Sequence, residues 1–119
     1  MYQIEFYEDK NGKCEIEDYF NKLRNSNSKE DRIKTEKIRM YIRLLSIHGL
    51  QLGEPYIKKI DKEIWELRPL RDRILFVSLY NNKFVLLSYF MKQTQKTPRR
   101  EIRKAKKLLD DYKRRNELL

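Results

Sequence analysis

The chain has 119 residues, of which 39% are hydrophobic and 39% are charged, and its 28 Lys and Arg outnumber 18 Asp and Glu to give a net charge of +10. This length suits one domain, and a single cysteine and a single histidine exclude a disulfide scaffold, a multi-cysteine zinc site and any site that needs two histidines. We therefore expect residues 1–119 to form one domain whose partner is polyanionic, either nucleic acid or an anionic membrane.

No segment has the pattern of a secretion signal or of a membrane span. Residues 1–9 are acidic rather than basic and then apolar. The longest mostly apolar run, residues 74–80, is much shorter than the roughly 20 residues that cross a bilayer. We expect a cytoplasmic protein that does not span a membrane.

The first half of the chain predicts one strand and two helices. Apolar residues alternate over residues 2–7, which is the period of a strand. A helical stripe follows, formed by Ile16, Tyr19, Phe20 and Leu23. After a polar break at residues 25–28, Ser28 suits the N-cap of a second helix and Gly49 suits its end. The stripe of that second helix contains Ile38, Tyr41, Ile42 and Leu45.

The second half predicts strands and a final helix. Residues 57–60, 64–67, 73–80 and 84–90 are rich in strand formers, and Asn81-Asn82-Lys83 suits a hairpin turn. Thr97 suits the N-cap of the last helix and Pro98 its first position. We expect an α+β fold in which a small antiparallel sheet carries the helices on one face, with one strand fewer if residues 56–60 are irregular.

The positive charge is concentrated in the second half of the chain. Residues 68–115 hold 15 Lys and Arg against 4 Asp and Glu, whereas the rest of the chain is nearly neutral. One-sided basic surfaces are typical of proteins that bind a polyanion, because each neutralised phosphate releases counterions. For the last helix alone, a solvated basic face explains the pattern equally well.

A strand-forming segment is interrupted by three arginines, Arg68, Arg71 and Arg73, whose guanidinium groups have no evident structural use there. If residues 73–80 pair with residues 84–90, Arg73 lies near the strand end that leads into Lys92. We therefore expect one end of the sheet to bring together Arg68, Arg73, Lys92 and Lys96.

The sequence WELRPLRDRILF at residues 65–76 and KFVLLSYFMKQTQKTPRREI at residues 83–102 resembles the HigB/RelE-type toxins of bacterial type II toxin–antitoxin systems. The similarity is to their phage-derived HigB-like branch, whose pattern includes an E-L-R motif and, later, F-x-K-K-T-x-K-T-P-x-x-E-I. This sequence has Gln93 where the branch often has a second Lys. It also has Arg99 and Arg100 in the region where RelE relatives carry a C-terminal tyrosine.

The resemblance implies a RelE-like, microbial-RNase-like fold and ribosome-dependent cleavage of messenger RNA. It also implies a hetero-oligomer with a small HigA-like antitoxin, usually one with a helix-turn-helix DNA-binding domain.

RNA cleavage of this kind uses the 2′-hydroxyl of the substrate as nucleophile, so the protein must move protons and stabilise the charge on phosphorus. Arg68 and Arg73 suit bidentate phosphate binding and charge stabilisation. Lys92 or Lys96 suits the general acid, or the base if neighbouring cations lower its pKa. The residues do not decide between these two assignments.

A second group of residues is expected to contact RNA around the catalytic candidates. Tyr89 suits stacking on an unstacked base, whereas Phe90 suits the core. The basic members of this group are Arg71, Arg99, Arg100 and Arg103. We expect no metal and no cofactor, because the carboxylates at positions 15, 17, 18, 110 and 111 fall on helix surfaces.

Two other functions fit parts of the pattern. A non-catalytic module that binds RNA or the ribosome would use the same basic helix. A helix that lies on a membrane surface fits less well, since the apolar side of the last helix has no Trp or Phe. We therefore expect no membrane partner.

Overall fold

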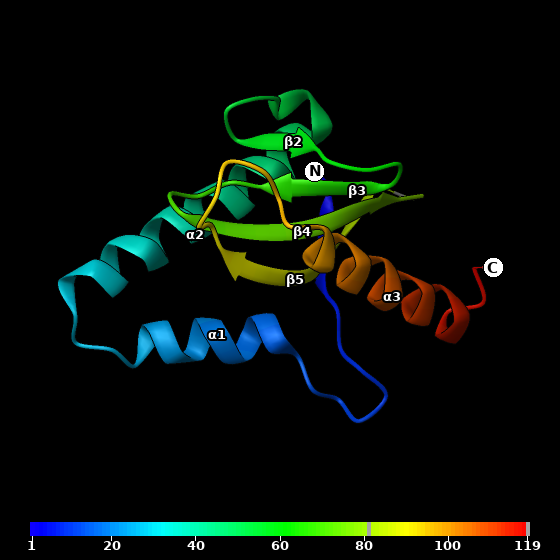
Figure 1. Ribbon diagram of the computed structural model, residues 1–119, viewed down its shortest axis with the longest axis horizontal. Coiled ribbons are helices and arrows are strands. Elements are labelled where there is room, and N and C mark those ends of the chain that lie inside the picture. The colour runs from blue at the N-terminus through cyan, green and yellow to red at the C-terminus, as the bar shows by residue number, and fades with distance from the viewer. Residues whose placement is uncertain (81, 119) are drawn as a thin grey trace.

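The computed structural model describes residues 1–80 and 82–118 (Figure 1). Its elements in chain order are β1 (Gln3–Phe6), α1 (Glu15–Arg24), α2 (Lys29–His48), the short 3₁₀ helix η1 (Gly49–Leu52), β2 (Ile57–Lys59), β3 (Ile64–Leu67), β4 (Asp72–Leu79), β5 (Lys83–Met91) and α3 (Arg99–Arg115). The expected α+β class is confirmed. The structure is a small α+β domain with a five-stranded sheet and three α-helices, consistent with a RelE-like fold.

The sheet has the strand order β1-β5-β4-β3-β2. Strands β2 to β5 are antiparallel neighbours, but β1 pairs in parallel with β5, with Gln3 opposite Lys83. The expectation of a wholly antiparallel sheet is therefore wrong at this one edge. Local patterning predicts hairpins, whereas the pairing of the first strand with the last depends on how α1 and α2 return the chain across the sheet.

Helices cover both faces of the sheet, not one face as expected. Ile74 and Phe76 of β4 pack with α1 and α2, while Leu75 and Val77 pack with α3. The reason is visible in the burial of β4 and β5, whose central residues are buried on both faces and need a helix on each side.

Helix ends follow the predicted chemistry, with one exception. The Ser28 hydroxyl accepts a hydrogen bond from the Asp31 amide, and Gly49 ends α2 at a φ of 62°. At α3 the N-cap is Pro98, so the helix begins one residue later than predicted. Thr97 does not cap this helix, because its hydroxyl donates a hydrogen bond to the Glu66 carboxylate.

The β4–β5 pairing contains a bulge that changes which side chains share a face. Leu75 pairs with Ser88, but the next residue, Phe76, pairs with Leu86, so Leu87 has no partner of its own. Leu79 pairs with Lys83 across the predicted turn, of which Asn81 lies outside the described residues. Within the described residues, no helix is long and apolar enough to cross a membrane.

Candidate functional site

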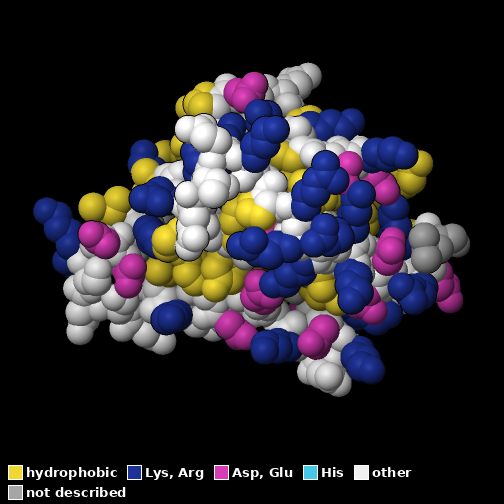
Figure 2. All heavy atoms as spheres, viewed as in Figure 1, with side chains coloured by type: hydrophobic (Ala, Val, Ile, Leu, Met, Phe, Trp, Pro, Cys, Tyr) yellow, Lys and Arg dark blue, Asp and Glu magenta, His cyan; other side chains and the backbone are white. Residues whose placement is uncertain are grey.

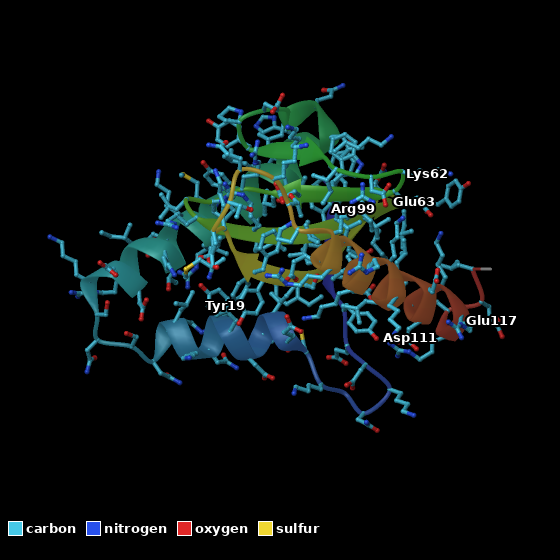
Figure 3. The ribbon with its side chains drawn as sticks, viewed as in Figure 1. Tyr19, Lys62, Glu63, Arg99, Asp111 and Glu117 are labelled. Atoms are coloured by element: carbon cyan, nitrogen blue, oxygen red, sulfur yellow. The ribbon has the colours of Figure 1, made fainter. Side chains whose placement is uncertain are left out.

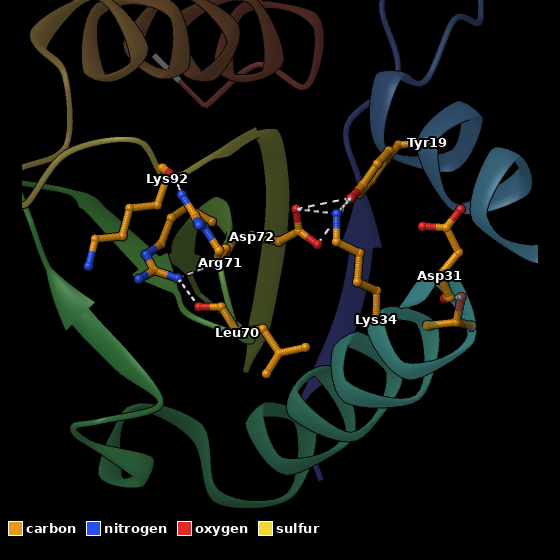
Figure 4. Close-up of polar contacts among 9 residues, drawn as sticks. Tyr19, Asp31, Lys34, Leu70, Arg71, Asp72 and Lys92 are labelled. Atoms are coloured by element: carbon orange, nitrogen blue, oxygen red, sulfur yellow. Dashed lines mark hydrogen bonds and ion pairs between the residues drawn. The ribbon is translucent and has the colours of Figure 1, made fainter. Parts of the chain in front are cut away.

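A basic pocket lies at the end of the sheet where the turn from β3 to β4 meets the end of β5. The main chains of Arg71 and Lys92 are joined by a 2.7 Å hydrogen bond from the Lys92 amide, and an Arg71 Nη donates to the Lys92 carbonyl at 3.1 Å (Figure 4). The pocket has a volume of about 370 Å³ and is lined by Leu70, Arg71, Arg73, Lys92, Gln93, Thr94 and Gln95. Three cationic side chains and three neutral hydrogen-bonding side chains thus surround one hollow, which suits an anionic ligand.

Behind the pocket lies a buried carboxylate, Glu66, which is 3% exposed. Its Oε1 is 3.4 Å from Arg68 Nε and 3.7 Å from Arg73 Nε, and its Oε2 accepts a hydrogen bond from Thr97. Successive strand residues point to opposite faces, so Glu66 is on the face that α3 covers, as are its neighbours Ile64 and Leu75. The carboxylate neutralises part of the charge of two arginines that lie side by side.

Arg73 is the most constrained cation of the pocket. It is 6% exposed, and its Nη1 donates to the carbonyls of Leu70 at 2.8 Å and Asp72 at 2.9 Å. Burial lowers the pKa of Arg73, and the nearby Glu66 carboxylate opposes this effect. With Nη1 used by the main chain and Nε facing Glu66, the remaining donors of the guanidinium are on Nη2, which makes no hydrogen bond within the described part of the chain.

The opposite face of the same strand end carries a second polar cluster. Asp72 is 1% exposed, and both of its carboxylate oxygens accept from the Tyr19 hydroxyl at 3.0 Å. Lys34 Nζ lies 3.9 Å from the same carboxylate. Figure 4 shows Tyr19 of α1 and Lys34 of α2 converging on Asp72, with Arg71 and Lys92 on its other side. This cluster ties both helices to the first residue of β4, directly beside Arg73.

The pKa values of this cluster reflect its burial. Desolvation raises the pKa of Asp72, and the hydrogen bond from Tyr19 and the charge of Lys34 oppose it. Desolvation together with the neighbouring Asp72 carboxylate raises the pKa of Tyr19. Tyr19 projects from α1 toward the sheet (Figure 3), and its ring stacks on Tyr89 with centroids 4.0 Å apart.

The structure brings some of the predicted site residues together and separates others. Arg71, Arg73 and Lys92 line the pocket. Arg68 lies behind it, paired with Glu66 and, at 3.7 Å, with Glu54. Lys96 is exposed in the segment that joins β5 to α3 and does not line the pocket.

Tyr89 does not share a face with Arg73, contrary to the expectation that both contact one substrate. An unbroken hairpin with Leu79 opposite Lys83 would place Tyr89 opposite Arg73. The bulge at Leu87 shifts the register by one residue, so Phe90 pairs with Arg73. The ring of Tyr89 consequently packs against Tyr19, and Phe90 packs with the core on the α3 side, as expected.

The basic side of α3 is partly neutralised by ion pairs. Lys104 pairs with Glu15, Lys106 with Asp61 and Lys113 with Glu63. The predicted RNA contacts Arg99, Arg100 and Arg103 are exposed on its first turns, and within the described residues Arg99 and Arg103 have no carboxylate partner. Figure 2 shows Lys and Arg side chains gathered over α3 and the adjoining part of the sheet.

Sequence reasoning missed Glu66 and Asp72, the two buried carboxylates that hold the site. Each has a signal in the sequence: Glu66 interrupts a short apolar strand, and Asp72 lies between two arginines at the start of another. Charged residues at such positions are rarely buried without partners. In the described part of the chain, no three His, Cys, Asp or Glu side chains come together in a way that could hold a metal ion.

Comparison with known proteins adds one finding. The family model described as "Phage derived protein Gp49-like (DUF891)" matches residues 19–110, a span that contains every residue lining the pocket as well as Glu66 and Asp72. No curated protein matches the chain.

Proposed function

Because the chain belongs to the phage-derived Gp49-like family, a RelE-like family associated with toxin–antitoxin systems, we propose that it is the toxin of such a system and cleaves messenger RNA on the ribosome. Membership in this family indicates a toxin-type function and suggests an antitoxin partner. The cognate partner is an antitoxin of the HigA-like, helix-turn-helix kind.

The observation that carries the proposal is the pocket of Arg71, Arg73 and Lys92 with Glu66 behind it. A phosphodiester carries one negative charge, and the phosphorane formed by 2′-hydroxyl attack carries more. Cations that the fold already holds in place stabilise the additional charge without reorganising during the reaction. Arg73 is held by two main-chain carbonyls and a buried carboxylate, so it has this preorganised character.

The roles divide according to exposure. Arg73 contributes fixed charge from the wall of the pocket, while the exposed Arg71 and the half-buried Lys92 reach the phosphate oxygens from its rim. The proton of the attacking 2′-hydroxyl passes to one of Lys92 and Lys96 in its unprotonated form, or to a water molecule, and the other lysine gives a proton to the 5′-oxygen as its bond to phosphorus breaks. Lys92 lines the pocket, Lys96 acts from the exposed segment that follows it, and Arg68 acts from behind through Glu66. Splaying of the message in the ribosomal decoding site supplies the orientation that free RNA lacks.

The test is to map cleavage sites in cellular messages by primer extension after brief induction, with a translation-blocked control. Arg71→Ala and Lys92→Ala are the sharpest variants, since neither side chain takes part in the buried ion-pair cluster of Glu66 with Arg68 and Arg73. We expect each to lower cleavage about 100-fold, the usual cost of losing one charge-stabilising group. Lys22→Ala, a change on the exposed side of α1, is the matched control and should cleave like the wild type.

Cleavage that is unchanged in both pocket variants would refute the assignment of the pocket. A protein that slows translation but leaves messages intact would instead be a non-catalytic module that binds RNA or the ribosome. The exposed arginines on the first turns of α3 favour this second candidate, because they lie outside the pocket and suit backbone phosphates.

A further inference from the structure

Helix α2 is apolar on two sides, and only one of them is covered. On the inner side, Ile38 and Leu45 are buried in the core. On the outer side Ile33, Met40 and Ile47 are 48%, 43% and 42% exposed. These three residues are spaced by seven positions, which is close to two helical turns, so they form one line about 20 Å long. We call this line the outer stripe.

The outer stripe is bordered by arginines. Arg32, Arg39 and Arg43 are exposed, and their spacing places them together on one side of the stripe. None of the three has a carboxylate partner within residues 1–80 and 82–118. Lys37 and Glu30 lie on the other side of the stripe, and Glu36 lies on the arginine side. The border thus holds four basic and two acidic residues and keeps a net positive charge.

The surface is hollowed as well as apolar. A depression of about 510 Å³ is lined by Ile33 and Met40 and by Lys29, Arg32, Glu36 and Lys37. Figure 2 shows hydrophobic side chains exposed among Lys and Arg side chains over the end of the molecule at which α2 begins. Single exposed apolar residues scattered over a surface are ordinary. A line of three exposed apolar residues beside a depression and a row of arginines is instead typical of a surface that binds an amphipathic helix.

We propose that the outer stripe of α2 is a docking surface for a partner protein. The part of the partner that binds is an amphipathic helix with acidic residues on both flanks of its apolar side. The apolar residues of that helix would cover Ile33, Met40 and Ile47, and its carboxylates would pair with the arginine row. Given the proposed function, on which this identification rests, the partner is the antitoxin.

A second copy of this chain fits the surface poorly. In an antiparallel helix pair the arginine row would face its own copy, and in a parallel pair it would face the side that carries Lys37. Both arrangements oppose like charges, and the whole chain carries a net charge of +10. A membrane surface also fits less well, because the stripe has no Trp, Tyr or Phe to anchor it at the interface.

The stripe belongs to the helices on one face of the sheet, whereas Arg73 and its pocket face the α3 side. A helix bound to α2 would therefore leave the pocket itself uncovered. Partner binding and RNA binding are then separable by mutation.

The test titrates the full chain with a synthetic 21-residue amphipathic helix that has leucine at heptad a and d positions and glutamate on both flanks. A matched peptide has lysine on the flanks. We expect the glutamate peptide to bind and the lysine peptide not to bind. Ile33→Asp with Met40→Asp should weaken the binding of the glutamate peptide at least about tenfold. Arg32→Glu with Arg43→Glu should reverse the preference between the two peptides.

The control is Lys10→Glu with Lys13→Glu, which changes the net charge by the same amount as Arg32→Glu with Arg43→Glu but in an exposed loop distant in sequence from α2. The proposal is overturned if this control also reverses the preference between the two peptides, or if Ile33→Asp with Met40→Asp leaves the binding of the glutamate peptide unchanged. It is also overturned if the wild-type chain self-associates in sedimentation, or binds anionic phosphatidylserine vesicles, and the Ile33→Asp with Met40→Asp variant does not. A wild-type chain that leaves translated messages intact would refute the proposed function, yet the peptide titration would still decide whether the stripe is a docking surface.

Discussion

The buried carboxylate Glu66 provides the sharpest test of how the site is held. Glu66→Ala would leave the Arg73 guanidinium, 6% exposed, without the carboxylate that lies 3.7 Å from its Nε. Breaking a buried pair by removing one partner costs about 3–5 kcal/mol, because an uncompensated charge stays in the interior. Arg68 adds less to this cost, since its side chain is 21% exposed and also pairs with Glu54.

The measurement is urea unfolding at pH 7 followed by circular dichroism. Glu63→Ala is the matched control, because Glu63 pairs with Lys113 at the surface, where its side chain is 55% exposed. Surface pairs contribute about 0–1 kcal/mol, so the two alanine variants should differ by at least about 2 kcal/mol. Glu66→Gln should fall between them, since an amide oxygen can still accept the Thr97 hydroxyl.

The double variant Glu66→Leu with Arg73→Met separates charge from packing. If the unpaired guanidinium causes the loss, removing both charges should restore stability to within about 1 kcal/mol of the wild type. A double variant as unstable as Glu66→Ala, or a Glu66→Ala variant no worse than Glu63→Ala, would refute the reasoning.

Three further predictions concern the elements that support the pocket. Burial raises the pKa of the Asp72 carboxyl above its value in the unfolded chain, so the folded state binds the carboxyl proton more tightly. The stability that this bound proton adds is present below the unfolded pKa and is lost as the pH rises through the folded pKa. Asp72→Asn should therefore be more stable than the wild type at pH 7, and the difference in the free energy of unfolding should shrink toward pH 4. Urea unfolding across that pH range is the measurement, and a difference that grows on acidification would contradict the prediction. Gly49→Ala should cost about 2–4 kcal/mol of stability in thermal unfolding, because the φ of Gly49 is 62° and a Cβ there would lie 2.5 Å from the Tyr2 ring. Gly12→Ala is the control and should cost about 1 kcal/mol, because Gly12 has a φ of 80° but open space around it. Equal losses in the two variants would show that the Tyr2 contact is unimportant. Leu45→Ala, at a fully buried position of α2, should cost about 2–5 kcal/mol by the same measurement, and a loss under about 1 kcal/mol would mean that α2 does not anchor the core.

Local patterns in the sequence were sufficient for the elements themselves. The 3.6-residue and two-residue periods predict the helices and strands, and Ser28 and Gly49 predict the ends of α2, because capping depends on a few neighbouring residues. The meeting of Arg73 with Lys92 also follows from the sequence, since the two strands are joined by a short turn and must pair.

Contacts between distant segments were decided only by the tertiary structure. The parallel pairing of β1 with β5 and the second helical layer depend on the whole chain, not on any short window. The bulge at Leu87 is not visible as a pattern, yet it moves Tyr89 to the face opposite Arg73. The burial of Glu66 and Asp72 likewise depends on partners far away in the sequence, because a carboxylate is stable in the interior only where the fold supplies cations and donors.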